Sequence, residues 1–275
     1  MKPTPKADTQ IWRAPELGAE LLRGRFADFS YDVHAHDTAC FALLTGGAIR
    51  IRMRGTEFVA RRGDLYAIDA DEPHAGWPVD GEGWTQRTLY VDVAHLCALT
   101  GDERASTLSG GVVGPIIRDP ALCAALYDIH CSSELHGPSL HRDERYLAFA
   151  ARLVGRHLKE GARTAVAPRE TRAVEAVRRF LDDRLGEQVH LDEIAEAAGL
   201  PPFRLFRAFS RETGMTPHEY QRQARVRRAM QMIRRGGALS DIAAATGFAD
   251  QAHLTRTFRR MLGVTPGAYK TATRA

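Results

Sequence analysis

The last third of the chain contains an internal repeat, and this repeat limits the possible folds more than any other feature of the 275 residues. The first copy runs from Leu191 to Pro217 and the second from Leu239 to Pro266. The offset between the copies is 48 residues up to a shared glycine and 49 residues beyond it, so the second copy has one extra residue in its turn. Such repetition predicts two copies of one supersecondary unit.

Each copy has the pattern of a helix-turn-helix. Gly199 and Gly247 stand where the chain must reverse, and glycine tolerates the left-handed backbone that ends a helix. The helix after the turn has two apolar residues four positions apart, which face inward together. These inward pairs are Leu205 with Phe209 and Leu254 with Phe258.

The two copies differ where the helix after the turn begins. Asp250 is predicted to cap this helix in the second copy, because a carboxylate accepts hydrogen bonds from the free amides of a first helical turn. The first copy has Pro201 and Pro202 instead. Proline suits a first helical turn, but it supplies no side-chain cap.

Charge is divided unequally along the chain. From Arg169 onward there are 19 Lys and Arg against 12 Asp and Glu, a net charge of +7, whereas residues 1–168 carry a net charge of −3. A helical bundle without a ligand is the alternative interpretation, since helix pairs with a glycine turn are common. A basic region that also contains two helix-turn-helix copies favours a polyanion partner.

The repeat resembles the DNA-binding domain of the AraC/XylS family of bacterial transcription regulators. The matching segments are Phe206–Gly214 (FRAFSRETG) and Gly247–Arg260 (GFADQAHLTRTFRR), and the resemblance covers roughly the last 105 residues. It implies two recognition helices joined by a long helix over about Pro217 to Arg235. In this arrangement the recognition helices enter successive major grooves on one face of double-stranded DNA, about 34 Å apart.

Base-reading candidates follow from the two recognition helices. Arginine can bind guanine through two hydrogen bonds and glutamine can bind adenine, while aromatic and small apolar side chains suit the thymine methyl group. The candidates are Phe203, Arg204, Phe206 and Arg207 in the first helix, and Gln251, Ala252, His253, Thr255 and Arg256 in the second. Further arginines are candidates for phosphate contact or for plain surface charge: Arg211, Arg222, Arg225, Arg227, Arg228 and Arg259.

The first half of the chain has the pattern of short strands. Residues 49–54 alternate between apolar and charged side chains, which is typical of a half-buried strand. Gly46–Gly47 and Arg54–Gly55 are predicted to be the turns on either side. Further strands are predicted over 58–60, 65–68 and 88–91, and even spacing of short strands favours a small antiparallel barrel.

Two motifs in this region resemble those of a cupin barrel, the usual sensor domain of the regulator family. They are His34-Ala35-His36 and the segment from Gly63 to His74. In metal-binding cupins two histidines, a glutamate and a third histidine hold the metal, which implies His34, His36 and His74 here. The glutamate position falls at Cys40 or Phe41, so that ligand is absent. Three imidazoles can still bind a metal, but we expect structural histidines or contact with an organic effector, and no cofactor.

A barrel mouth is a common site for small molecules. The candidates for effector contact are His34, His36, Tyr66, His74, Trp77 and Tyr90. The alternative is that the aromatic side chains simply fill the core. Cys40, Cys97, Cys123 and Cys131 have neither zinc-site nor disulfide spacing, so we expect buried, reduced thiols.

Two helices are predicted after the barrel, over residues 120–135 and 140–159, where they cover the barrel or, by resemblance, form a dimer interface. We therefore expect an α+β protein of two domains. Residues 1–160 form a cupin-like effector-binding and dimerisation domain, with the barrel over about 17–95 and helices over about 115–160. Residues 161–168 are a linker with few large apolar side chains. Residues 169–275 form an all-α DNA-binding domain of two helix-turn-helix units.

The resemblance implies a sequence-specific, effector-responsive transcription activator that binds promoter DNA and RNA polymerase as a homodimer. The sequence has no apolar leader and no run of about 18 apolar residues, so we expect a cytoplasmic bacterial protein that joins the nucleoid when bound to DNA. One alternative is a metal-dependent cupin enzyme with an appended nucleic-acid domain, against which the missing carboxylate counts; enzymatic activity is therefore not expected. Another is a protein that coats DNA without sequence preference.

Overall fold

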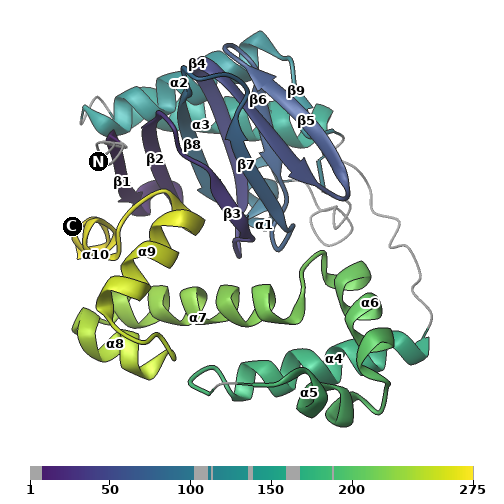
Figure 1. Ribbon diagram of the computed structural model, residues 1–275. Helices are drawn as coiled ribbons and strands as arrows, with labels where there is room; N and C mark the ends of the chain where they lie inside the picture. The colour runs from purple at the N-terminus through teal and green to yellow at the C-terminus, as the bar shows by residue number, and fades with distance from the viewer. Residues whose placement is uncertain are drawn as a thin grey trace. The chain divides into compact units, whose positions relative to one another are not determined.

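The computed structural model describes residues 8–101, 111–112, 114–135, 139–158, 168–187 and 189–274. The chain forms two compact units, with the main division between residues 163 and 164. Residues 161–167 of the predicted linker lie outside the described part of the chain. The N-terminal unit is built on antiparallel strands and the C-terminal unit is helical (Figure 1), so the expected α+β fold class is confirmed.

The N-terminal unit contains a nine-stranded antiparallel sheet with the central order β1-β2-β8-β4-β6-β9, in which β5 and β7 also pair with β4, and β3 pairs with β7. The strands are β1 (Asp8–Ala14), β2 (Ala19–Phe26), β3 (Tyr31–His34), β4 (Ala39–Met53), β5 (Thr56–Arg61), β6 (Leu65–Ile68), β7 (His74–Pro78), β8 (Trp84–Val91) and β9 (Ile116–Ile117). A 3-10 turn, η1 (Pro15–Leu17), joins β1 to β2. The sheet therefore begins at Asp8, earlier than the predicted start near residue 17.

The predicted turn at Gly46–Gly47 is wrong, because β4 continues through it. The register against β8 shifts between Leu44 and Gly46, which leaves Thr45 as an extra residue in β4. This bulge changes which side chains point inward, since strand side chains alternate between faces. Before the bulge the even-numbered Leu44 is buried on the inner face, and after it the odd-numbered Ile49 takes that role.

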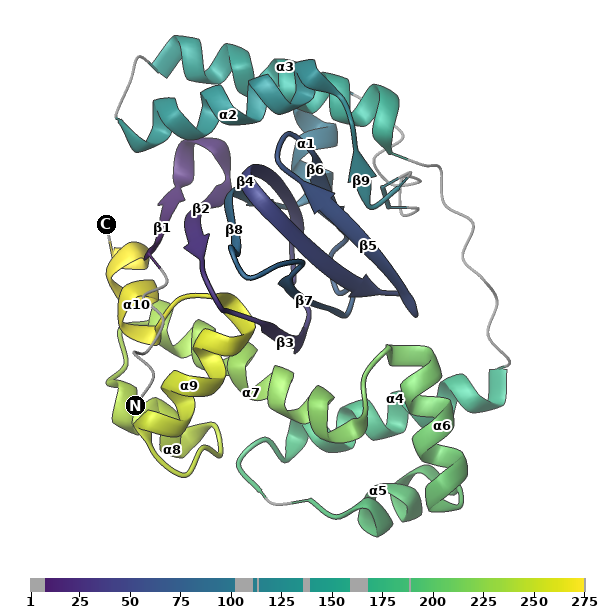
Figure 2. The same cartoon turned by 45° about the horizontal axis from the view of Figure 1, so that its top comes forward.

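The outer face of the sheet packs against helices. Phe41, Leu21 and Leu89 lie in register on neighbouring strands and belong to one buried apolar cluster. The helices α2 (Pro120–Glu134) and α3 (Ser139–His157) lie side by side over this face (Figure 2), and α1 (Val93–Thr100) packs against α3. Phe149 of α3 contacts Phe41 edge to face, with ring centroids 5.9 Å apart.

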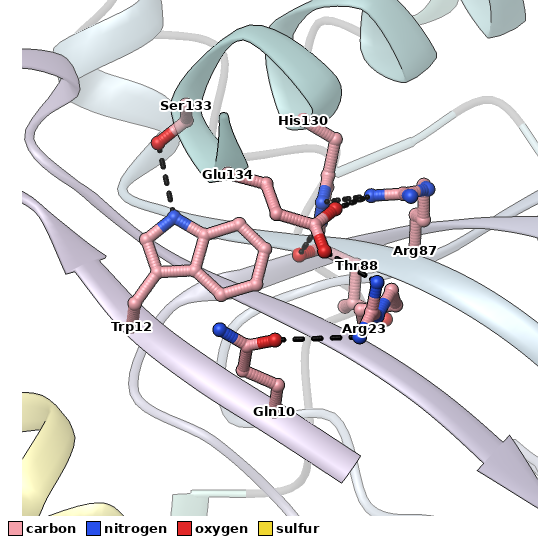
Figure 3. Close-up of polar contacts among 8 residues, drawn as sticks. All are labelled: Gln10, Trp12, Arg23, Arg87, Thr88, His130, Ser133 and Glu134. Carbon is pink, nitrogen blue, oxygen red and sulfur yellow. Dashed lines mark hydrogen bonds and ion pairs between the residues drawn. The ribbon is translucent and has the colours of Figure 1, made fainter. Parts of the chain in front are cut away.

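A partly buried polar network fastens α2 to the sheet (Figure 3). Arg87 of β8 donates to Glu134 at 2.7 Å and to Nδ1 of His130 at 3.2 Å. Arg23 of β2 forms an ion pair with the same Glu134 carboxylate, and the indole of Trp12 on β1 donates to Ser133 at 3.0 Å. Burial works to raise the pKa of Glu134, but the hydrogen bond and charges of Arg87, with the charge of Arg23, outweigh burial and lower it.

The C-terminal unit consists of seven helices among the described residues: α4 (Pro168–Asp183), α5 (Leu191–Ala198), α6 (Pro202–Thr213), α7 (Pro217–Arg234), α8 (Leu239–Ala245), α9 (Gln251–Leu262) and α10 (Pro266–Arg274). The first helix-turn-helix, α5 and α6, shares an apolar core with α4. The second, α8 and α9, packs with α10. The helix α7 connects the two pairs, and α6 and α9 lie at its opposite ends (Figure 1).

Candidate nucleic-acid interface and effector site

The first helix-turn-helix has the geometry that its glycine predicts. Gly199 ends α5 in the left-handed conformation, with φ of 62°. Leu205 and Phe209 of α6 are fully buried against α4 and α5. The opposite side of α6 carries the four base-reading candidates: Phe203 is 72% exposed, Phe206 is 39% exposed, and Arg204 and Arg207 are both exposed. The Arg207 guanidinium lies 5.8 Å from the centroid of the Phe203 ring.

The second helix-turn-helix repeats this geometry with a stronger start to its second helix. Gly247 is left-handed, with φ of 75°, and Asp250 accepts a hydrogen bond from the backbone amide of His253 at 2.6 Å. The predicted cap at Asp250 is therefore confirmed, and the first copy has no side-chain cap at Pro201.

The candidates on α9 differ in exposure. Gln251, Ala252 and Arg256 are exposed, whereas His253 and Thr255 are half-buried. The His253 ring packs edge to face on Phe248 at 5.3 Å. The Thr255 hydroxyl donates to the backbone carbonyl of Gln251 at 2.8 Å.

Arg225, predicted to contact phosphate or to be plain surface charge, binds three backbone carbonyls within the C-terminal unit. Its Nε donates to the carbonyl of Leu185 at 2.7 Å, and its two terminal nitrogens donate to the carbonyls of Glu187 and Gly247, each at 2.8 Å. Burial lowers the pKa of Arg225. No sequence pattern distinguishes an arginine that binds carbonyls from one that binds phosphates, because both uses need the same guanidinium.

The three histidines of the cupin-like motifs come together. Each offers a ring nitrogen, and these three atoms lie within 4.8 Å of one another. Nδ1 of His34 donates to the carbonyl of Asp32 at 2.7 Å, and Nδ1 of His74 donates to the carbonyl of Glu72 at 2.9 Å. These bonds assign the proton to Nδ1, so Nε2 carries the lone pair that accepts hydrogen bonds or ligates metals. Burial lowers the pKa of His74 to about 4, which keeps it neutral.

The three remaining effector candidates, Tyr90, Tyr66 and Trp77, lie in different surroundings. Tyr90 joins the cluster, with its ring 5.2 Å from that of His36. Tyr66 is buried within the sheet and its hydroxyl donates to Gln86 at 2.9 Å. Trp77 lies on the opposite face from His74, because it is in register with the outward-facing Arg50, and it stacks instead under Arg52 at 5.8 Å.

The sheet interior also holds a polar chain that the sequence pattern did not predict. Gln86 accepts hydrogen bonds from Tyr66 and from the indole of Trp84, at 2.7 Å for the latter, and donates to Thr88 at 3.0 Å. All four side chains are buried. Side chains alternate along β8, so Trp84, Gln86 and Thr88 lie on one face of the strand. This alternation is the sequence pattern from which the polar hydrogen-bond chain could have been predicted.

The thiols have the expected form. Cys40, Cys97 and Cys123 are free and buried, and Cys131 is free and partly buried. Burial raises the pKa of Cys40 and of Cys123, so both remain protonated thiols at neutral pH. The cupin glutamate was expected to fall at Cys40 or Phe41, and neither residue replaces that carboxylate: Cys40 is a protonated thiol, and the Phe41 ring packs against Phe149.

Comparisons with known proteins match both units. A helix-turn-helix domain family matches residues 194–272, and the AraC-like ligand binding domain family matches residues 16–150. An uncharacterized HTH-type transcriptional regulator of Bacillus subtilis, YbfI, is 26% identical over 244 residues, 87% of each chain. The HTH-type transcriptional activator RhaS of Escherichia coli is 33% identical over 88 residues, 32% of each chain.

Solved structures show the same fold. Apo ToxT from Vibrio cholerae aligns over 98% of both chains with a TM-score of 0.52 and 10% sequence identity. At that identity the likeness concerns the fold alone. Within the described residues, no helix has the length and apolar character needed to cross a bilayer.

Proposed function

Because the chain belongs to the AraC/XylS family of transcription regulators, we propose that it binds promoter DNA by placing α6 and α9 in successive major grooves. The observation that supports this most is the repeated helix pair, whose second helix buries the same apolar pair and exposes the opposite side in both copies. The connecting α7 has 18 residues, a length of roughly 27 Å, which is comparable with one turn of DNA.

The two helices carry different side chains at equivalent positions, so the proposed DNA site is asymmetric. With the offset of 49 residues, Arg207 corresponds to Arg256, and both are exposed. The neighbouring positions differ, since Phe203 corresponds to Ala252 and Phe206 to Thr255. We infer that each helix reads a guanine through its arginine, and that the other contacts distinguish the two half-sites.

Selection from a random duplex library tests this proposal. Full-length protein should enrich one sequence with two different conserved blocks, whose centres lie about 10 base pairs apart. Enrichment of a palindrome within one protein's footprint, of a single block, or of no sequence at all would contradict the two-groove arrangement. The last result would favour the protein that coats DNA without preference.

For the N-terminal unit we propose the sensing of an organic effector by the cluster of His34, His36, His74 and Tyr90. Three imidazoles, of which His74 is neutral, and an aromatic ring suit a polar molecule with an apolar part. The same three imidazoles also fit a divalent transition metal, which would supply a Lewis acid with open positions. The missing carboxylate and the protonated Cys40 are the reasons to favour the organic effector and a binding role over enzymatic turnover.

A thermal-shift screen distinguishes these ligands. Metabolites are screened against the full-length protein with EDTA present, and Zn²⁺, Mn²⁺ and Fe²⁺ are added alone in separate wells. An organic effector should raise the melting temperature of the wild type but not of His74→Gln. A shift produced by metal alone, and lost in His74→Gln, would instead identify a metal site and restore the metal-dependent enzyme as an alternative.

We propose that effector binding to the N-terminal unit regulates transcription. Effector binding changes DNA occupancy or contact with RNA polymerase on a promoter in the bacterial cytoplasm, and the name of the relative RhaS supports activation.

We propose a homodimer formed through the α2–α3 apolar surface, defined by four exposed side chains. These are Tyr127 of α2, Leu135 directly after α2, and Leu140 and Leu147 of α3. The support for this surface is that the four apolar side chains are exposed on or next to two helices that pack against each other.

A further inference from the structure

Arg225 connects the turn between α4 and α5 to the turn of the second helix-turn-helix through backbone carbonyls. The turn of residues 184–187, which follows α4 and leads to the first unit, supplies two of its acceptors, the carbonyls of Leu185 and Glu187. The third acceptor is the carbonyl of Gly247, in the turn before α9. We call Arg225 and these three carbonyls the guanidinium clamp. It joins two segments that are about 60 residues apart in the sequence, one before α7 and one after it.

The contact between the two turns is also direct. A Cβ atom on Gly247 would lie 2.5 Å from the Leu185 carbonyl oxygen and 3.0 Å from the Arg225 guanidinium carbon, so no side chain fits there. The equivalent glycine of the first copy, Gly199, has the same left-handed backbone, with φ of 62°, but nothing within 4 Å of such a Cβ. The repeat therefore supplies two matched glycines, of which one lies at the clamp and the other does not.

Gln221 provides a second internal comparison. It lies one helical turn before Arg225 on α7, is buried, and donates to the carbonyls of Arg184 and Glu187, each at 3.2 Å. Gln221 thus anchors the same turn without contacting Gly247. A substitution at Gln221 loosens the turn alone, whereas one at Arg225 also releases the second unit.

We propose that Arg225 is a positioning residue for DNA recognition: the guanidinium clamp fixes α9 relative to α6 and so determines the spacing of base pairs that the protein accepts. The fork of five N–H donors on one planar group suits three carbonyls in different directions, which a lysine ammonium reproduces only in part. A long helix alone does not fix this orientation, because α7 can bend along its length. The inference rests on the two-groove arrangement proposed above.

The test measures affinity as a function of spacing. The probe is the duplex selected by the full-length wild type, together with versions carrying one or two extra base pairs between its two blocks. Two base pairs rotate one groove relative to the other by roughly 70°. The wild type should lose about tenfold or more on the two-base-pair insertion, because one helix then loses its base contacts. Arg225→Met should bind the original duplex more weakly but lose less than about threefold on insertion.

Matched variants separate positioning from folding. Gln221→Met and Gly199→Ala should keep the spacing dependence of the wild type. Gly247→Ala should weaken that dependence. The spacing dependence of Arg225→Lys should be intermediate between those of the wild type and Arg225→Met. A duplex that carries only one block should bind wild type and Arg225→Met equally. If Arg225→Met does not fold by circular dichroism, Arg225→Lys and Gly247→Ala decide by the same criterion.

The outcomes that overturn the inference are distinct from those that overturn the proposed function. If selection gives no two-block site, the two-groove arrangement fails. If a two-block site is selected, and Arg225→Met or Gly247→Ala shows the full spacing dependence of the wild type, the arrangement stands and the positioning role of Arg225 is wrong. If Gln221→Met weakens the spacing dependence as much as Arg225→Met does, the guanidinium clamp only stabilises the turn of residues 184–187, and the positioning role is wrong.

Discussion

His130 is fully buried in the N-terminal unit, and both of its ring nitrogens are engaged. Its Nε2 donates to the backbone carbonyl of Thr88 at 3.0 Å, and its Nδ1 accepts from Arg87 at 3.2 Å (Figure 3). Burial lowers its pKa to about 4, opposed by the hydrogen bond to the Thr88 carbonyl and supported by the charge of Arg87. The neutral ring is therefore the form that the fold selects.

This shift makes the stability of the N-terminal unit depend on pH. The folded pKa of His130 is about 4 and the unfolded value about 6.5, so stability is retained above pH 6.5 and lost as the pH falls toward 4. Between pH 7 and pH 5 the loss from this residue is about 2 kcal/mol. His130→Gln should show a smaller fall in unfolding free energy over that range, measured by urea denaturation.

The same substitution at the exposed His218 serves as the matched control. His74 adds a dependence of the same sign, because burial also lowers its pKa to about 4, so His130→Gln should reduce the pH dependence without abolishing it. An unchanged dependence in His130→Gln would show that the ring is not held neutral as described.

At the scale of elements, the two recognition helices begin differently although the repeat makes them equivalent. The start of α9 has the Asp250 side chain as acceptor for the His253 amide, while α6 starts with Pro201 at its N-cap and no side-chain acceptor. Proline fixes the backbone φ angle at the start of α6. This lowers the conformational entropy of the unfolded chain but supplies no hydrogen-bond acceptor to the helix end. Loss of the cap should therefore affect α9 in particular.

Asp250→Ala should destabilise the C-terminal unit by about 1 kcal/mol, because one amide of the first turn loses its partner. It should also weaken binding to the α9 block of the selected duplex, since Gln251 and Ala252 lie in that first turn. Asp241→Ala is the matched control, as it removes an exposed carboxylate from the first turn of α8, where no side-chain cap is present. Equal losses from the two variants would argue for a general charge effect instead.

At the scale of the molecule, the repeat predicted the two helix pairs and the alternation of strand residues predicted an antiparallel domain, while the long connecting helix and the cupin-like character came from the resemblance to the AraC/XylS family. The helix pairs, the left-handed glycines and the Asp250 cap follow from local backbone chemistry, which a sequence displays directly. The β4 bulge at Thr45 was missed because two consecutive glycines also fit a turn. The polar chain around Gln86 and the carbonyl contacts of Arg225 were missed because their partners lie on distant segments.

The proposed homodimer leads to a prediction for the α2–α3 apolar surface. Leu147→Glu should raise the dimer dissociation constant by at least about tenfold, because burying a leucine contributes about 1.5–3 kcal/mol and a charge at its position opposes association. Sedimentation velocity over a range of concentrations measures this. Leu99→Glu, at an exposed leucine of α1 outside the surface, is the control. Identical association of wild type and Leu147→Glu would exclude this surface as the interface.

The most direct test of two-groove reading is methylation interference at guanine N7 on the selected duplex, with wild type, Arg207→Ala and Arg256→Ala. The wild type should show interference in two blocks about one helical turn apart on one face of the DNA. Arg207→Ala should lose the signal at a guanine of one block, and Arg256→Ala at a guanine of the other. Loss of the same guanine in both variants, or a uniform fall in affinity with the interference pattern unchanged, would contradict the account.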